Sequence, residues 1–132
     1  MERRLLQIVV ALGCAVPLLA GGAGMVEGPA FLSGVGNGAP ADLDSHFRYL
    51  SGPLFAIGLG FASRVPGIER KTARFRLLAL LVFVGGLGRL TGLVSSGAPG
   101  PGHLFGLAME IGTVPLLVLW QARVAALRAG RE

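Results

Sequence analysis

The sequence predicts an all-α protein, a bundle of four transmembrane helices in up-down order. Composition is the first reason: of 132 residues, 52% are hydrophobic and only 14% are charged, whereas about a quarter of the residues in a soluble domain are charged. The second is a series of four apolar segments, each long enough to cross about 30 Å of hydrocarbon. The third is that the basic residues cluster between these segments. We expect residues 1–132 to form a single integral membrane domain.

The four predicted helices cover about residues 5–26, 45–63, 75–95 and 103–122. The first contains no charged residue, and Pro17 should bend it. A loop rich in glycine and proline follows at residues 28–40, after which Asp42 or Asp44 can cap the second helix. A basic hairpin at residues 64–74 leads to the third helix, and a short loop with two prolines joins the third helix to the fourth.

Small residues recur at every fourth position in three of the helices, where they allow neighbouring helix backbones to approach closely. The positions are Gly13, Pro17 and Gly21; Gly52, Ala56 and Gly60; and Gly88 and Gly92. We expect these rows to form the helix contacts. Pro53 and Pro115 should bend the second and fourth helices.

The distribution of lysine and arginine predicts that both termini face the cytoplasm. Ten of the twelve basic residues precede the first helix, flank the connection between the second and third, or follow the fourth. They are Arg3, Arg4, Arg64, Arg70, Lys71, Arg74, Arg76, Arg123, Arg128 and Arg131. The loops on the other side, residues 27–43 and 96–102, contain none. Alternatively the first segment is a cleaved secretory signal, but its length and the lack of an Ala-x-Ala site favour a retained helix.

Three charged residues lie well inside the predicted helices: Arg48, Arg89 and Glu110. A charge near the middle of a bilayer costs roughly 2.5–3.5 kcal/mol, so such residues are rare unless they are paired. A helix rises about 1.5 Å per residue, which places the three about 6, 9 and 10 Å below the outer ends of their helices. We therefore expect them to meet in one layer of the extracytoplasmic half. His103 shares a helix face with Glu110, and Asp44 shares one with Arg48.

This polar layer has a functional and a structural interpretation. Two guanidiniums can bind carboxylate, phosphate or quinone oxygens, with Glu110 as the counter-charge. Alternatively, the network only locks the helices together. His46 and His103 are metal-ligand or proton-carrier candidates, but they can equally be interfacial polar residues, and their spacing matches no ligand signature, so we predict no metal site. For Asp44 we favour a helix cap over a catalytic role.

Two segments resemble a known family. Residues 44–52, DSHFRYLSG, are similar to the hallmark of the bacterial domain-of-unknown-function 4345 family, and residues 85–90, GGLGRL, resemble its second motif. Pro99 and Glu110 also fit, and the similarity covers nearly the whole chain. The resemblance implies a small, multi-pass protein of the bacterial inner membrane with four helices and no assigned activity. It also implies that five polar residues act as one unit. They are Asp44, His46, Arg48, Arg89 and Glu110.

Three classes of function remain open. The polar layer can bind a polar or amphipathic small molecule, such as a lipid headgroup or a quinone, without catalysis. The protein can be an accessory or assembly subunit of a larger membrane complex. It can also be an isomerase-type intramembrane enzyme with His46 or Glu110 as acid or base, although no spacing matches a known catalytic motif. We predict no cofactor and, because basic and aromatic residues are not interleaved, no nucleic-acid partner.

Overall fold

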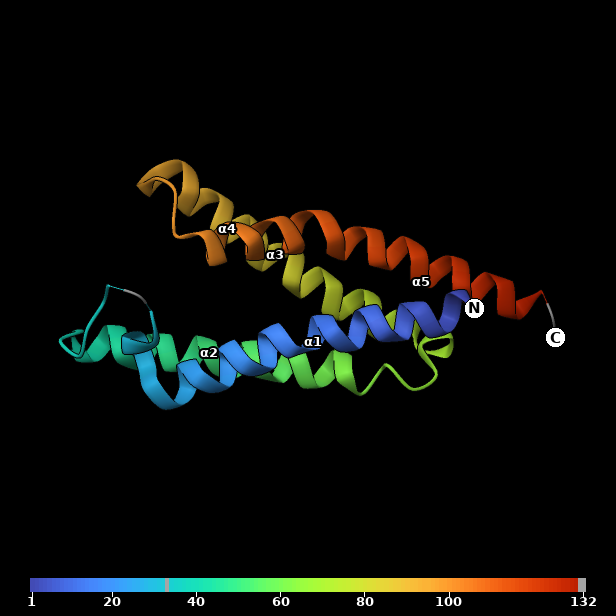
Figure 1. Ribbon diagram of the computed structural model, residues 1–132, viewed down its shortest axis with the longest axis horizontal. Helices are drawn as coiled ribbons and strands as arrows, with labels where there is room; N and C mark the ends of the chain where they lie inside the picture. The colour runs from blue at the N-terminus through green and yellow to red at the C-terminus, as the bar shows by residue number, and fades with distance from the viewer. Residues whose placement is uncertain (33, 131–132) are drawn as a thin grey trace. The chain divides into compact units, whose positions relative to one another are not determined.

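The computed structural model describes residues 1–32 and 34–130, which form helices and no strand (Figure 1). In chain order the elements are α1 (Glu2–Glu27), η1 (Gly28–Phe31), α2 (Ala41–Ala62), η2 (Ile68–Arg70), α3 (Thr72–Ser96), α4 (Pro101–Ala108), η3 (Met109–Thr113) and α5 (Val114–Ala129). The segments α4, η3 and α5 follow one another without a break and form the fourth helix, of which η3 is a π-helical stretch. The predicted all-α fold with four helices is confirmed.

The fourth helix extends further than the sequence suggested. It continues to Ala129, whereas we expected it to end at about residue 122. The reason is local composition, because the alanines, leucine and arginines of this segment are strong helix formers. The basic residues Arg123 and Arg128 therefore lie on α5. Arg131, which we counted among the basic residues that set the orientation, lies outside the described residues.

Three helices in the described part of the chain are long and apolar enough to cross a membrane. They are Glu2–Phe31, which joins α1 to η1, then α3, and then the whole fourth helix, Pro101–Ala129. Helix α2 is not among them, and its first half carries Asp42, Asp44 and Arg48. Its second half, from Leu54 to Ala62, is apolar.

The chain divides into two compact units, which we describe separately. The α1–α2 unit spans Ile8–Val65. In it, α1 and α2 lie side by side and antiparallel (Figure 1). A Cβ added at Gly21 would lie 2.7 Å from the backbone nitrogen of Phe55, and one added at Gly58 would lie 3.0 Å from Cγ of Leu18. Only glycine permits this approach of the two backbones at Gly21, because no side chain could fit there without a shift.

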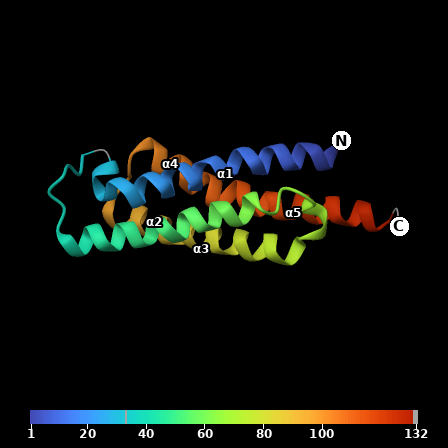
Figure 2. The ribbon, with the colours of Figure 1, turned by 90° about the horizontal axis from the view of Figure 1, so that it is seen from below.

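The α3–α5 unit consists of Met1–Gln7 and Pro66–Glu132. Helix α3 packs along η3 and α5 (Figure 2). Near the start of α3, the side chain of Gln121 from α5 is fully buried. Its Nε2 donates to the carbonyl oxygen of Ile68 at 2.8 Å and to Oγ1 of Thr72 at 2.9 Å. Gln121 thus holds η2 and the start of α3 against α5 by specific hydrogen bonds.

The predicted rows of small residues agree with the close helix contacts at Gly21 but not at four other positions. A Cβ added at four of the predicted positions would meet no atom within 4 Å; they are Gly13, Gly52, Gly88 and Gly92. Close approaches occur at Gly21, as predicted, and also at Gly24, Gly58 and Gly86, which lie outside the predicted rows. The prediction was wrong at the first four positions, because two helices touch only where their axes cross, and a regular spacing does not reveal where that is.

Helix α2 begins one turn earlier than expected. Pro40 is its N-cap residue, with φ −54° and ψ 145°, and the first helical bond runs from the N–H of Asp44 to the carbonyl of Pro40 at 3.0 Å. Neither Asp42 nor Asp44 is the cap, so that prediction was wrong. Both carboxylates lie in the first turn instead, where they stabilise the positive end of the helix dipole.

Candidate functional site

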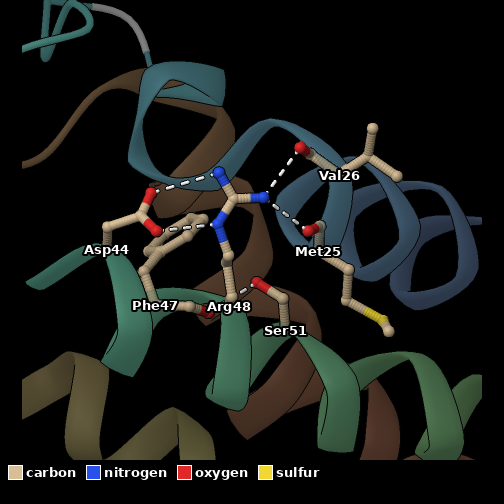
Figure 3. A network of polar contacts seen from close by, with 6 residues as sticks. All are labelled: Met25, Val26, Asp44, Phe47, Arg48 and Ser51. Atoms are coloured by element: carbon tan, nitrogen blue, oxygen red, sulfur yellow. Dashed lines mark hydrogen bonds and ion pairs between the residues drawn. The ribbon is translucent and has the colours of Figure 1, made fainter. Parts of the chain in front are cut away.

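Arg48 is the centre of a polar network in the α1–α2 unit (Figure 3). Its Nε donates to Oδ2 of Asp44 at 2.8 Å, and its Nη2 donates to Oδ1 of the same carboxylate at 3.2 Å. Its Nη1 donates to the carbonyl oxygens of Met25 and Val26, both at 2.7 Å. An arginine has five N–H donors, and four of them are occupied in this network.

The carbonyl partners of Arg48 explain why an arginine is needed there. Met25 and Val26 lie in the last turn of α1, where carbonyl groups have no partner within the helix. A cation at this end also interacts favourably with the negative end of the helix dipole. The helix stops at Gly28, whose φ of +65° disfavours other residues. A Cβ there would also lie 2.7 Å from Nη2 of Arg48, so Gly28 is required for two reasons.

A second network, in the α3–α5 unit, contains Arg89, His103 and Glu110. Nε of Arg89 lies 3.1 Å from both carboxylate oxygens of Glu110. Nη1 of Arg89 lies 2.9 Å from Nδ1 of His103. Because arginine can only donate, Nδ1 must be the acceptor, and the proton of a neutral His103 ring then lies on Nε2. The three residues come from α3, α4 and η3, so one arginine connects three segments.

The position of Glu110 depends on the π-helical segment and on a glycine opposite to it. In η3 the N–H of Val114 bonds to the carbonyl of Met109, five residues earlier, and Pro115 follows directly, where proline lacks the N–H of a regular helix. A Cβ at Gly86 of α3 would lie 2.9 Å from Cβ of Glu110. Gly86 therefore lets Glu110 approach α3. π-Helical turns inside α-helices occur frequently at functional sites.

Arg89 retains donors that the described residues do not use. One N–H of Nη1 and both N–H groups of Nη2 have no hydrogen-bond partner among them, which leaves three of the five donors free. The side chain of Arg89 is 38% exposed, compared with 18% for Glu110. His103 is exposed as well. The centre can therefore donate several hydrogen bonds to one acceptor group, such as a carboxylate, a phosphate or a carbonyl oxygen.

A third charged centre, which the sequence did not predict, is formed by Glu69 of η2, in the connection before α3. The Glu69 side chain is only 4% exposed, and Nη1 of Arg128 donates to its Oε1 at 2.5 Å while Nε of Arg3 lies 3.3 Å from its Oε2. Burial raises the pKa of Glu69, but its own backbone hydrogen bond and the charges of Arg3 and Arg128 outweigh that effect, so the pKa lies below its ordinary value. The signal in the sequence was a single acid within the basic hairpin.

Of the other predicted site residues, two belong to the networks and one does not. Asp44 joins Arg48, and His103 joins Arg89 and Glu110, as described above. His46 is exposed and makes no hydrogen bond or ion pair with the described residues. In residues 1–32 and 34–130, no group of three histidine, cysteine or acidic side chains is arranged to hold a metal ion. The two networks belong to different units, and their meeting in one layer stays a prediction.

A comparison with protein families matches residues 5–121 to the family described as Domain of unknown function (DUF4345). The chain belongs to the DUF4345 family. The match includes both arginine networks and ends at Gln121, the buried residue that anchors α5. The comparison with curated proteins found no match, and the comparison with solved structures found none either. Membership of DUF4345 thus agrees with the resemblance seen in the sequence, and the family description assigns no activity.

Proposed function

We propose that this DUF4345 protein is a multi-pass membrane protein that binds a polar or amphipathic small molecule at the centre formed by Arg89, His103 and Glu110. The observation that carries the proposal is the set of three free N–H donors on a partly exposed guanidinium. A guanidinium that only locks helices together would be expected to use most of its donors within the protein. Free donors within an apolar helix favour a ligand with acceptor oxygens, such as a lipid headgroup or a quinone.

The membrane arrangement we propose has four crossings with both termini in the cytoplasm of a bacterial inner membrane. The three apolar helices support three of the crossings. For α2, pairing within its polar first half supports a fourth, because the charge of Arg48 is balanced by Asp44 and its donors are occupied. A paired charge is far less costly in a bilayer than an isolated one. In this orientation Arg89 and Glu110 lie in the extracytoplasmic half.

Extraction from native membranes would test the proposed binding. Wild type, Arg89→Gln and Arg123→Gln would be purified in mild detergent, and the retained lipids and quinones would be identified and counted by mass spectrometry. We expect wild type to retain one class of amphipathic molecule, and Arg89→Gln to retain it about tenfold less, since hydrogen bonds to a charged group contribute roughly 1.5–3 kcal/mol. Arg123 is the matched control, because it lies on the same unit and pairs with Glu2 at 3.1 Å.

The outcomes separate the three classes of function. Equal retention by folded wild type and folded Arg89→Gln would contradict the binding site. A second protein that copurifies with wild type at constant stoichiometry, with no retained small molecule, would favour the accessory-subunit hypothesis instead. An intramembrane enzyme would chemically change the retained molecule, and the isomerase hypothesis therefore requires a product that Glu110→Gln does not form.

A further inference from the structure

Four arginines in the α3–α5 unit are exposed and make no side-chain hydrogen bond or ion pair with the described residues. We call this set the arginine collar: Arg4, Arg70, Arg74 and Arg76. Three of its members lie within seven residues at the end of η2 and the start of α3. The fourth, Arg4, is brought to the same end of the unit, because its neighbour Arg3 pairs with Glu69 of η2 at 3.3 Å.

The carboxylates at this end of the unit are already engaged. Glu69 is paired with Arg3 and Arg128, and Glu2 is paired with Arg123. No other acidic residue occurs in the described parts of Met1–Gln7 and of residues 66–76 and 121–130. The collar therefore has no free counter-charge among the described residues at this end of the unit, and a concentration of unbalanced cations attracts an anionic partner.

The surface next to the collar indicates what kind of partner this is. Immediately after Arg76, α3 exposes Leu77, Leu80 and Leu81, whose exposed fractions are 58%, 56% and 48%. Cations that border an exposed apolar helix surface are typical of the boundary between hydrocarbon and headgroups. Arg74 and Arg76 are two positions apart and so point to different sides of the helix. A ring of headgroups around the helix end can meet both, whereas one flat protein surface cannot.

The predominance of arginine over lysine indicates the chemical group that the partner presents. Eleven of the twelve basic residues of the chain are arginines, and the only lysine is Lys71. Lysine serves membrane orientation as well as arginine does, since that effect depends on charge. Arginine adds a planar fork of donors that binds phosphate oxygens in a bidentate manner. We propose that the arginine collar binds the phosphate groups of anionic phospholipids in the leaflet that surrounds this end of the protein.

Reconstitution into nanodiscs would test this lipid site. Purified protein would be placed in phosphatidylcholine that contains a minor fraction of phosphatidylglycerol, and the lipids released with the protein would be counted by native mass spectrometry. Wild type should enrich phosphatidylglycerol over phosphatidylcholine. Replacing all four arginines by glutamine should reduce that enrichment by about tenfold or more, because each basic residue near an anionic surface contributes about fivefold. High salt should weaken the enrichment in wild type.

Two further variants make the result decisive. Replacing the four arginines by lysine keeps the charge and should retain part of the enrichment, and Arg123→Gln, which removes a paired arginine, should retain nearly all of it. If the fourfold glutamine variant does not fold, Arg74→Gln/Arg76→Gln should still lose about half of the effect on a logarithmic scale. Equal counts of the two lipids on wild type, or unchanged enrichment in a folded glutamine variant, would overturn the proposal. The lipid site rests on the proposed membrane insertion, but none of these variants alters Arg89, so the result is independent of ligand binding at the Arg89 centre.

Discussion

Arg48 and Arg89 have nearly the same exposure but differ in how their donors are used. Their side chains are 39% and 38% exposed, and each pairs with one carboxylate. Arg48 uses four of its five donors within the protein, two of them on the carbonyls that end α1. Arg89 uses two, on Glu110 and on His103. The same residue type, in helices of the same small protein, thus acts as a helix clamp at one position and has free binding capacity at the other.

The difference shows that charge within an apolar helix does not by itself indicate a binding site. Either arginine would carry a desolvation cost in a bilayer. That cost is offset at Arg48 by backbone carbonyls and Asp44, and only in part at Arg89 by Glu110 and His103. Counting occupied donors therefore separates a structural arginine from a candidate ligand-binding arginine more sharply than exposure or depth does.

The largest effect that this comparison predicts is a loss of stability in Arg48→Gln. The substitution leaves the last carbonyls of α1 and the carboxylate of Asp44 without their donor, and we expect the free energy of unfolding to fall because four hydrogen bonds are lost together. Titration with a denaturing detergent, followed by circular dichroism, would measure it. Arg89→Gln should lose about half as much, because fewer donors are engaged. If Arg89→Gln were less stable than Arg48→Gln, Arg89 would be the structural residue, and the roles assigned to the two arginines would be wrong.

Much of this difference could not be read from the sequence. Hydropathy and the basic clusters predicted four helices, because burial in lipid and charge placement act on residue types. The spacing of four between Asp44 and Arg48 also predicted a shared face. The carbonyl partners of Arg48 could not be predicted, because every residue has a carbonyl and no residue type marks which one is unpaired.

The other missed features have equally definite causes. Glu69 was assigned to a basic hairpin because its partners Arg3 and Arg128 are distant in the sequence, and pairing over such distances follows only from the packing of the helices. Pro115 indicated an irregular fourth helix, but proline alone does not distinguish a kink from a π-helical turn. The seven-residue spacing of His103 and Glu110 suggested one face, and the structure places both against Arg89.

Glu69 is a carboxylate that can be compared with the two arginines, and its titration makes the stability of the protein depend on pH. Its two arginine partners make it a structural centre like Arg48. The pKa of Glu69 is lowered in the folded protein, so its contribution to stability is present above the ordinary pKa of 4.5 and is lost as the pH falls through the lower, folded pKa. Glu69→Gln should lower stability near neutral pH by about 1–2 kcal/mol, since its arginines remain partly hydrated.

The measurement for Glu69 is the melting temperature of wild type and Glu69→Gln across the acidic range. Wild type should lose stability below about pH 4.5, and the variant should lose less over the same range because it lacks the titrating group. Arg123→Gln, which breaks the exposed pair with Glu2, is the control and should follow wild type within about 1 kcal/mol. Parallel curves for wild type and Glu69→Gln would show that Glu69 is not a structural centre of this kind.

The most specific test of the Arg89 centre comes from Gly86→Ala. A methyl group there would lie 2.9 Å from Cβ of Glu110 and 3.0 Å from Cγ1 of Ile111, so η3 must move away from α3 and weaken the contact of Glu110 with Arg89. Alanine favours helix over glycine by up to about 1 kcal/mol, and this gain offsets part of the overpacking cost of about 1–3 kcal/mol. We expect a net loss of about 1–2 kcal/mol, together with reduced ligand retention.

Gly85→Ala is the matched control, because its methyl group would meet no atom within 4 Å. It should be neutral or slightly stabilising, with unchanged retention. Reduced retention in both variants would mean that the binding centre does not depend on the close approach of Glu110 to α3.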